Sequence, residues 1–223
     1  MKDTTVIYYT ANREKEAFES KIREKLLTVI GDMPLISVSH KPIVGFGKNI
    51  CVGDMPYCDL SALKQLYRGL KEATTTFAIV AESDCLYPPD YFSFTPPTTD
   101  NVYRYGNIWI LHAWVGPRNQ GKAWRKYYSE GAQMCGREFW IKKIEESWEK
   151  DQLVFNTKNQ YSWTSENPMI SFKTADGLRK DTKVIRSEEP KDELPYWGKV
   201  EDIKKEFFGV CNREGVNKKH YGK

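Results

Sequence analysis

The sequence lacks a hydrophobic run long enough to cross a bilayer. Its longest strongly apolar stretch, Ile108 to Val115, has eight residues and contains His112, whereas a membrane helix needs about 20 apolar residues. No secretory signal pattern opens the chain either, because Met1-Lys2-Asp3 leads directly into a β-branched run. We therefore expect a protein of the cytoplasm, with no membrane among its partners.

Cysteine and histidine are too few and too scattered for the common metal or disulfide frameworks. The chain has three histidines and five cysteines, and no two cysteines form a CxxC pair. This pattern excludes the usual zinc templates and favours a reduced chain. The chain also lacks a large excess of charge of either sign, since 34 basic and 30 acidic residues give a net charge of +4 and a pI near 8.6. Such a balance permits a polyanionic partner without requiring one.

The first half of the chain predicts alternating strands and helices. Thr4 to Thr10 and Pro34 to Ser39 are β-branched or apolar runs, and between them Glu14 to Ile30 carries apolar residues at helical spacing. An amphipathic helix over Ser61 to Ala73 then precedes a wholly apolar strand, Phe77 to Ala81. Repeated strand–helix–strand units favour an α/β fold with a mostly parallel sheet.

The remaining segments are less regular. His40 to Asp59 holds two prolines and three glycines and is predicted as a long loop. Asn101 to Tyr105 and Ile108 to Val115 are predicted as strands, and Gly131 to Lys150 as a helix. The final third is irregular and charged except for a short helix over Val200 to Phe208. With 223 residues we expect one domain, 1–223.

Two carboxylates follow the apolar strand directly. Glu82 and Asp84 flank Ser83, and the carboxyl end of a strand is where open α/β sheets bind ligands. Carboxylate oxygens suit Mg2+ or Mn2+, and such an ion can bridge a diphosphate. The alternative is a solvated turn in which Asp84 serves as a cap.

A known family shares these segments. The matching stretches are Val6 to Asn12, Pro34 to Pro42, Gly47-Lys48-Asn49, Gln65 to Ala73 and Phe77 to Pro88, which contains Ala81-Glu82-Ser83-Asp84-Cys85-Leu86-Tyr87. Together they resemble glycosyltransferases of the GT-A fold, and look closest to small bacterial and viral family-two-like enzymes. The resemblance covers about the first half of the chain. It implies a Rossmann-like, mostly parallel central sheet flanked by helices, with a nucleotide-sugar-binding half, 1–90, and an acceptor half with a C-terminal tail, 91–223.

The resemblance also implies roles for particular residues. Base and ribose would lie near Thr10, Ala11, Asn12 and Arg13, the donor phosphate or ribose near Lys48 and Asn49, and the diphosphate near Glu82, Ser83 and a metal ion on Asp84. Asp84 would be the centre of activity, with Mn2+ or Mg2+ as the cofactor and His220 as a third metal ligand. Glu82 departs from the family, which often has Asp there, and its side chain is longer than that of Asp by one methylene.

The general base stays open at this point. An inverting transfer needs a carboxylate near the acceptor hydroxyl and a retaining one does not present such a base clearly. The sequence does not decide between these outcomes. The candidate bases are Glu130, Glu166, Asp176 and the pair Glu201-Asp202.

The resulting prediction is a metal-dependent enzyme that moves a sugar from a nucleoside diphosphate sugar, with UDP preferred, to an acceptor hydroxyl. The acceptor is either a hydroxymethylated base in DNA or a cytosolic glycan precursor. A basic tail, Lys218 to Lys223, together with Lys122, Arg125 and Lys126, suits a phosphate backbone. The alternatives are a carbohydrate- or nucleic-acid-binding module without turnover, and nucleotidyl transfer, for which no second pair of acids is seen in a strand-like setting.

Overall fold

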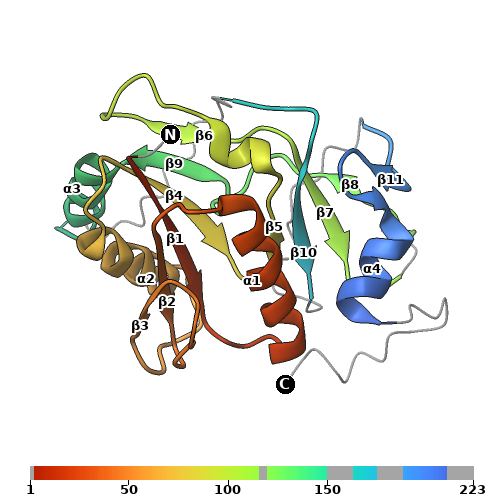
Figure 1. Cartoon of the computed structure of the whole chain (residues 1–223), viewed down its shortest axis with the longest axis horizontal. Helices are drawn as coiled ribbons and strands as arrows, with labels where there is room; N and C mark the ends of the chain where they lie inside the picture. The colour runs from red at the N-terminus through yellow and green to blue at the C-terminus, as the bar shows by residue number, and fades with distance from the viewer. Residues whose placement is uncertain (1–2, 116–119, 150–162, 175–187, 210–223) are drawn as a thin grey trace.

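The computed structural model describes residues 3–115, 120–149, 163–174 and 188–209 (Figure 1). Its central sheet has six strands in the order β3-β2-β1-β4-β9-β6. They are β1 (Thr4–Thr10), β2 (Leu35–Ser39), β3 (Lys48–Cys51), β4 (Phe77–Glu82), β6 (Val102–Arg104) and β9 (Gln133–Gly136). The first four in spatial order are parallel, and β9 lies antiparallel between β4 and β6. The expected α/β fold with a mostly parallel sheet is confirmed.

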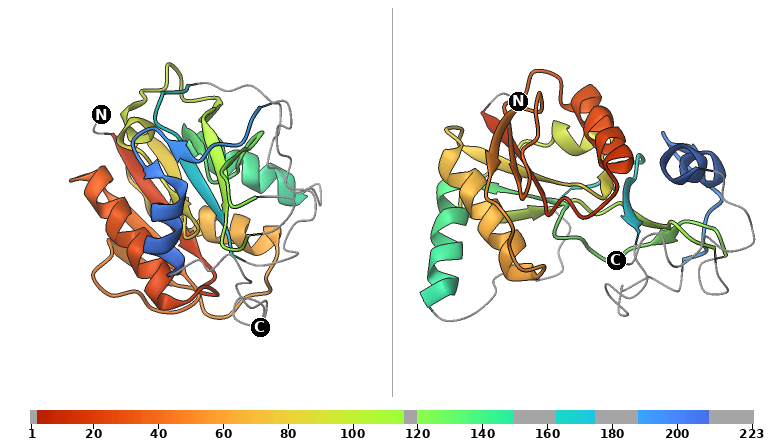
Figure 2. Two further views of the ribbon diagram at one scale, coloured as in Figure 1. Left: turned by 90° about the vertical axis from the view of Figure 1, so that its right-hand side faces the viewer. Right: turned by 90° about the horizontal axis from the view of Figure 1, so that it is seen from below.

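Helices cover both faces of this sheet. Side chains alternate along β1, so that Val6 and Tyr8 pack on one face with Leu26 of α1 (Glu16–Ile30). Ile7 and Tyr9 point to the other face, toward α2 (Asp59–Glu72) and α3 (Arg137–Glu149). Figure 2 shows α1 on one side of the sheet and α2 with α3 on the other. The strands β1, β2 and β4 between them are buried on both faces, which explains their largely apolar or β-branched sequences.

A second, four-stranded sheet adjoins the first. Its order is β5-β10-β7-β8, formed by β5 (Cys85–Leu86), β7 (Ile108–His112), β8 (Trp124–Arg125) and β10 (Met169–Lys173). One face is apolar and is covered by α1 and by α4 (Val200–Phe208), where the rings of Phe18, Phe172 and Phe207 meet edge-on or tilted. A short 3-10 helix, η1 (Pro89–Ser93), and the two-stranded β11 (Glu193–Leu194) and β12 (Gly198–Lys199) complete the described elements.

Some expected elements differ from the structure. The segment predicted as a loop from His40 to Asp59 contains β3, a half-exposed edge strand with no apolar run to reveal it. The helix predicted from Gly131 begins only at Arg137, because Gln133–Gly136 forms β9 between two strands. Nor did the sequence indicate β10 in the final third. In the part of the chain that the structure describes, no helix is both long and apolar enough to span a bilayer.

Candidate active site

The candidate site lies where the chain order of the central sheet reverses. From β1 the chain moves outward through β2 and β3, and then returns to the opposite side of β1 to form β4. Crevices at such a switch point, at the carboxyl ends of the strands, are where open α/β sheets bind ligands. Here Tyr9 of β1 is paired in register with Glu82 of β4. The acidic turn predicted from the sequence therefore lies at the reversal.

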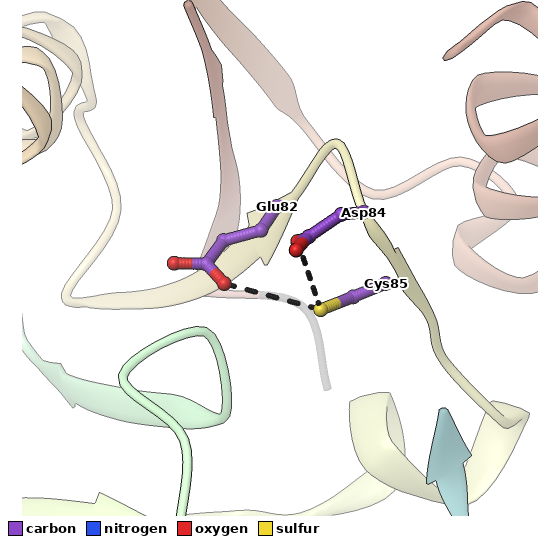
Figure 3. A group of neighbouring side chains, drawn as sticks. All are labelled: Glu82, Asp84 and Cys85. Atoms are coloured by element: carbon purple, nitrogen blue, oxygen red, sulfur yellow. Dashed lines mark hydrogen bonds between the residues drawn. The ribbon is translucent and has the colours of Figure 1, made fainter. Parts of the chain in front are cut away.

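Three side chains form a compact group at this point. One ligand atom from each of Glu82, Asp84 and Cys85 lies within 4.8 Å of the other two (Figure 3). The Cys85 thiol points toward both carboxylates, with Sγ 3.4 Å from Asp84 Oδ1 and 3.9 Å from Glu82 Oε2. The main-chain oxygen of Asp84 accepts a 2.7 Å hydrogen bond from the Phe172 amide of β10. The turn is thus held between the two sheets, with Ser83 half-buried inside it.

Neighbouring residues position the Glu82 carboxylate closely. The Tyr9 hydroxyl donates a 2.6 Å hydrogen bond to Glu82 Oε1, and the Glu82 amide donates to the Tyr87 hydroxyl at 2.9 Å. That hydroxyl in turn donates to the Gly131 carbonyl at 2.8 Å. A Cβ on Gly131 would lie 2.3 Å from Glu82 Oε2, so a side chain at this position would force the carboxylate to move.

Burial and nearby negative charge raise the pKa of Glu82 to about 7. Desolvation is the larger cause, followed by Asp84, while the Tyr9 hydrogen bond and Lys126 lower the pKa. A divalent cation would offset the repulsion between the two carboxylates, and oxygen donors are the ligands that Mg2+ and Mn2+ prefer. The donor set of Glu82 and Asp84 therefore fits such an ion.

The turn after β1 forms the adjacent wall. The Thr10 hydroxyl donates to Glu19 Oε1 at 3.1 Å and accepts from the Asn12 amide at 2.9 Å. Asn12 has a φ of 49°, in the left-handed region that Asn tolerates, and its Oδ1 accepts from the Lys41 amide at 2.8 Å. Buried Gln65 donates to the carbonyls of Thr10 and of Val38. Thr10 to Asn12, including half-buried Ala11, is therefore a fixed turn beside the acids.

Arg13 and Tyr57 form an exposed pair over the same edge. The Arg13 guanidinium lies 4.4 Å from the centroid of the Tyr57 ring, and Tyr57 is 54% exposed. Burial raises the pKa of Tyr57, and the Asp84 charge raises it further, so the ring lies within electrostatic range of the acid group. Burial raises the pKa of Glu14, the hydrogen bond from Thr174 of the other half lowers it, and the Asp84 charge raises it further. A flat, exposed aromatic ring thus borders the acids.

The structure does not bring Lys48 and Asn49 to this group. Lys48 begins β3, whereas the acids lie beyond the carboxyl end of parallel β4, and its ammonium pairs with Glu72 at the end of α2. Asn49 donates to the hydroxyls of Ser37 and Ser39, at 2.9 Å each, and accepts from the Ile43 amide at 3.0 Å. Its amide therefore fixes the segment between β2 and β3.

Of the candidate bases, the structure places Glu130 near the acids. Glu130 is half-buried and its charge raises the pKa of both Glu82 and Tyr9. Glu166 is exposed in the segment before β10, and Glu201 and Asp202 are exposed in the first turn of α4, which packs on the opposite, apolar face of the second sheet. Asp176 and His220 lie outside the described residues.

Sequence reasoning missed several residues of the site. Tyr9, Cys85 and Gly131 contact the acids, and Tyr57 borders them. Two of these carried a usable signal, since Tyr9 immediately precedes the turn after β1 and Cys85 directly follows Asp84. The others come from segments whose positions depend on contacts distant in sequence.

No protein-family model and no curated protein matches the chain. Among solved structures it is similar to TarS of S. aureus, with 13% identity over 78% of this chain and 37% of that one, at a TM-score of 0.43. It is also similar to glucosyl-3-phosphoglycerate synthase of Mycobacterium tuberculosis, with 15% identity over 66% and 65% of the two chains and a TM-score of 0.35. A third is the galactosyltransferase LgtC, with 12% identity over 68% and 66%, at 0.37. Such likeness concerns the course of the backbone.

Proposed function

We propose that the chain is a glycosyltransferase that moves a sugar from a nucleoside diphosphate sugar, with UDP as the preferred nucleotide, to an acceptor hydroxyl. The observation that carries this proposal is the pair Glu82 and Asp84 at the chain reversal of the sheet, beside a fixed turn and an exposed aromatic ring. That arrangement supplies a cation site and a nucleotide-binding edge within one crevice.

Glu82 and Asp84 would hold a Mn2+ or Mg2+ ion. When bound, such an ion neutralises charge on the departing diphosphate. The hydrogen bond from Tyr9 holds Glu82 Oε1 in place, and Gly131 leaves room for Glu82 Oε2. His220 is a further proposed metal ligand, on the basis of the sequence resemblance.

The nucleoside would lie along Thr10, Ala11, Asn12 and Arg13. The Arg13 and Tyr57 pair offers a flat surface on which a base can stack, and stacking of this kind is worth about 1–3 kcal/mol per base. Ser83 lies in the turn between the acids, where a diphosphate would approach. Lys48 and Asn49 have no part in this proposal, because their side chains are engaged elsewhere.

Glu130 is our proposed general base, because its charge raises the pKa of both Glu82 and Tyr9 and it therefore lies near the acids. A base must come within hydrogen-bond reach of the acceptor hydroxyl. Asp176 remains the second candidate from the sequence. The proposed acceptors are a hydroxymethylated base in DNA and a cytosolic glycan precursor, and a duplex base would have to be extruded to reach the crevice.

The test is a donor-hydrolysis screen of the purified full chain with UDP-, GDP- and dTDP-sugars in the presence of Mn2+. We expect hydrolysis of a UDP-sugar that EDTA abolishes and added Mn2+ or Mg2+ restores. Hydroxymethylated DNA and glycan precursors are then offered as acceptors. Full activity in a metal-free preparation would contradict the cation site, and binding of sugars without any hydrolysis would favour the binding-module alternative.

A further inference from the structure

One face of the second sheet is apolar, whereas the opposite, more polar face carries Ser171 and Lys173 beside the buried Ile110 and Met169. Leu111, Ile170 and Phe172 point toward α1 and α4 in a shared apolar cluster. Because side chains alternate along a strand, Ser171 and Lys173 point the other way. Lys126, just after β8, lies on that same side, since its Nζ is 3.4 Å from Ser171 Oγ. The polar face also includes Cys85, which pairs in register with Ser171.

Lys126 lies near Lys173 on this face, because it contacts Ser171, and Lys173 follows Ser171 by two residues on the same side of β10. Lys126 is half-buried, and its Nζ donates to Ser129 Oγ at 3.0 Å. Burial lowers the pKa of Lys126, and the positive charge of Lys173 lowers it further. The negative charges of Glu82 and Asp84 act in the opposite direction and raise the pKa of Lys126. Lys126 therefore lies between the acid group and Lys173.

Neither lysine has a carboxylate within 4.0 Å among the residues that the structure describes. Other cations nearby in sequence are compensated. Lys122 pairs with Asp192 at 2.8 Å, and Arg125 lies 3.5 Å from Glu188 and donates to Asn107. Glu82 and Asp84 lie within electrostatic range of Lys126, but in the described part of the chain no carboxylate contacts either ammonium directly. Two lysines and two hydroxyls on one face are suited to a phosphate group, which accepts several charge-assisted hydrogen bonds.

We propose that Lys126 and Lys173, with the hydroxyls of Ser129 and Ser171, bind a phosphate group of the acceptor. This rests on the proposed function, because the acids mark the end of the crevice where the sugar is transferred. Lys173 lies in the second sheet and Lys126 directly after it, both in the acceptor half of the chain, whereas Glu82 and Asp84 would hold the cation that receives the donor diphosphate. A sugar phosphate and a nucleic acid backbone share this phosphate chemistry.

The direct test measures binding of inorganic phosphate to the full chain without donor or metal, by calorimetry. We expect Lys173→Gln and Lys126→Gln each to weaken binding about tenfold, as loss of a charged hydrogen bond does. Lys64→Gln, at an exposed position on α2, is the matched control and should bind as the wild type does. Circular dichroism and melting temperatures establish whether each variant is folded. If Lys126→Gln does not fold, phosphate binding by Lys173→Gln alone tests the proposal. Wild-type affinity in the folded variants, equal loss in the control, or no binding by the wild type would overturn the proposal.

Asp84→Asn separates this site from the cation site. Because this change removes a negative charge near the lysines, phosphate binding should persist or tighten. Phosphate binding that requires Mn2+ and is lost in Asp84→Asn would place the anion on the metal and overturn the lysine site, leaving the proposed function intact. Conversely, phosphate binding that depends on the lysines in a protein that hydrolyses no donor would reject the proposed function, and with it the assignment of the phosphate to a transfer acceptor.

The two sources of phosphate are compared by competition. Glucose 1-phosphate and a single-stranded oligonucleotide are each titrated against bound inorganic phosphate in the wild type and in Lys173→Gln. Displacement by either, weakened in the variant, supports the proposal and identifies the source. Displacement by neither would refute it.

Discussion

The Asp84 side chain contacts the Cys85 thiol, whereas its main-chain oxygen holds β10. Asp84→Asn should therefore leave the fold intact while removing a charged metal ligand. We expect Mn2+-dependent donor hydrolysis to fall about 100-fold or more, the usual scale for loss of a key electrostatic group. Asp32→Asn, in the exposed turn after α1, is the matched control. Hydrolysis at more than half the wild-type rate in folded Asp84→Asn would reject the site.

Glu19 provides a prediction about stability and pH. It is 1% exposed, and burial raises its pKa from 4.5 to about 7, although Thr10 and Arg23 lower it. The folded state therefore holds a proton that the unfolded state releases near pH 4.5, and the free energy of unfolding falls as pH rises from 4.5 to about 7. Glu19→Gln lacks this titration. Its stability relative to the wild type should improve over that range by about 1.4 kcal/mol for each unit of raised pKa.

Urea denaturation of both proteins across this pH range measures the difference. A stability gap that stays constant with pH would show that Glu19 titrates normally in the folded protein. The hydrogen bond from Thr10 to Glu19 links this carboxylate to the turn beside the acids. Donor binding measured on the same samples tests whether the protonation of Glu19 also changes the turn that contains Thr10.

At the residue scale, the sequence places Glu82 and Asp84 at the carboxyl end of a strand, where the structure has them, and their role stays a prediction. Glu82 and Asp84 follow a buried strand whose apolar pattern is unambiguous. Lys48 and Asn49 were expected at the donor from the family resemblance, and their half-exposed edge strand has no apolar pattern that could test this expectation from the sequence. Without the register of β3 on β2, nothing indicates which end of the sheet a residue occupies.

At the scale of elements, the segment between β8 and β9 controls the position of Glu82. Gly131→Ala should displace the carboxylate, since the new Cβ would lie 2.3 Å from its oxygen. We expect Mn2+ affinity to fall about tenfold, in the range found when residues that orient metal ligands are changed. In a Glu82→Gln background the same change should add little further loss, because the two act through one group. Additive losses in the double variant would indicate that Gly131 acts by another route.

Elements with strong local patterns were predicted well. The strands β1, β2 and β4 and the helices α1, α2 and α4 follow from apolar periodicity. β9 and β10 did not, since Gln133–Gly136 and Met169–Lys173 are short and acquire their strand form by pairing with β4, β6, β5 and β7. Such pairing joins residues far apart in sequence, which no local pattern records.

For the whole molecule, ligand binding should appear as stability. A ligand that binds only the folded state at 100 times its Kd adds about 2.7 kcal/mol to the free energy of unfolding. Mn2+ together with UDP should therefore raise the melting temperature of the wild type, and Asp84→Asn should show little of this rise. The same shift in both proteins would mean that UDP binds without the acids.

The hydrogen bond between the Asp84 carbonyl and the Phe172 amide has a consequence for folding. It joins residues 88 positions apart, from 84 to 172, and the strand pair β5 and β10 closes a loop of similar length. Contacts between distant residues form slowly, because the entropy of the intervening chain is lost before the contact stabilises the structure. During refolding, the helical signal of α1 and α2 should therefore appear before the protein acquires Mn2+ affinity. Only one residue separates the two acids in sequence. The turn that holds them is nevertheless complete only after β10, in the last third of the chain, has paired with β5.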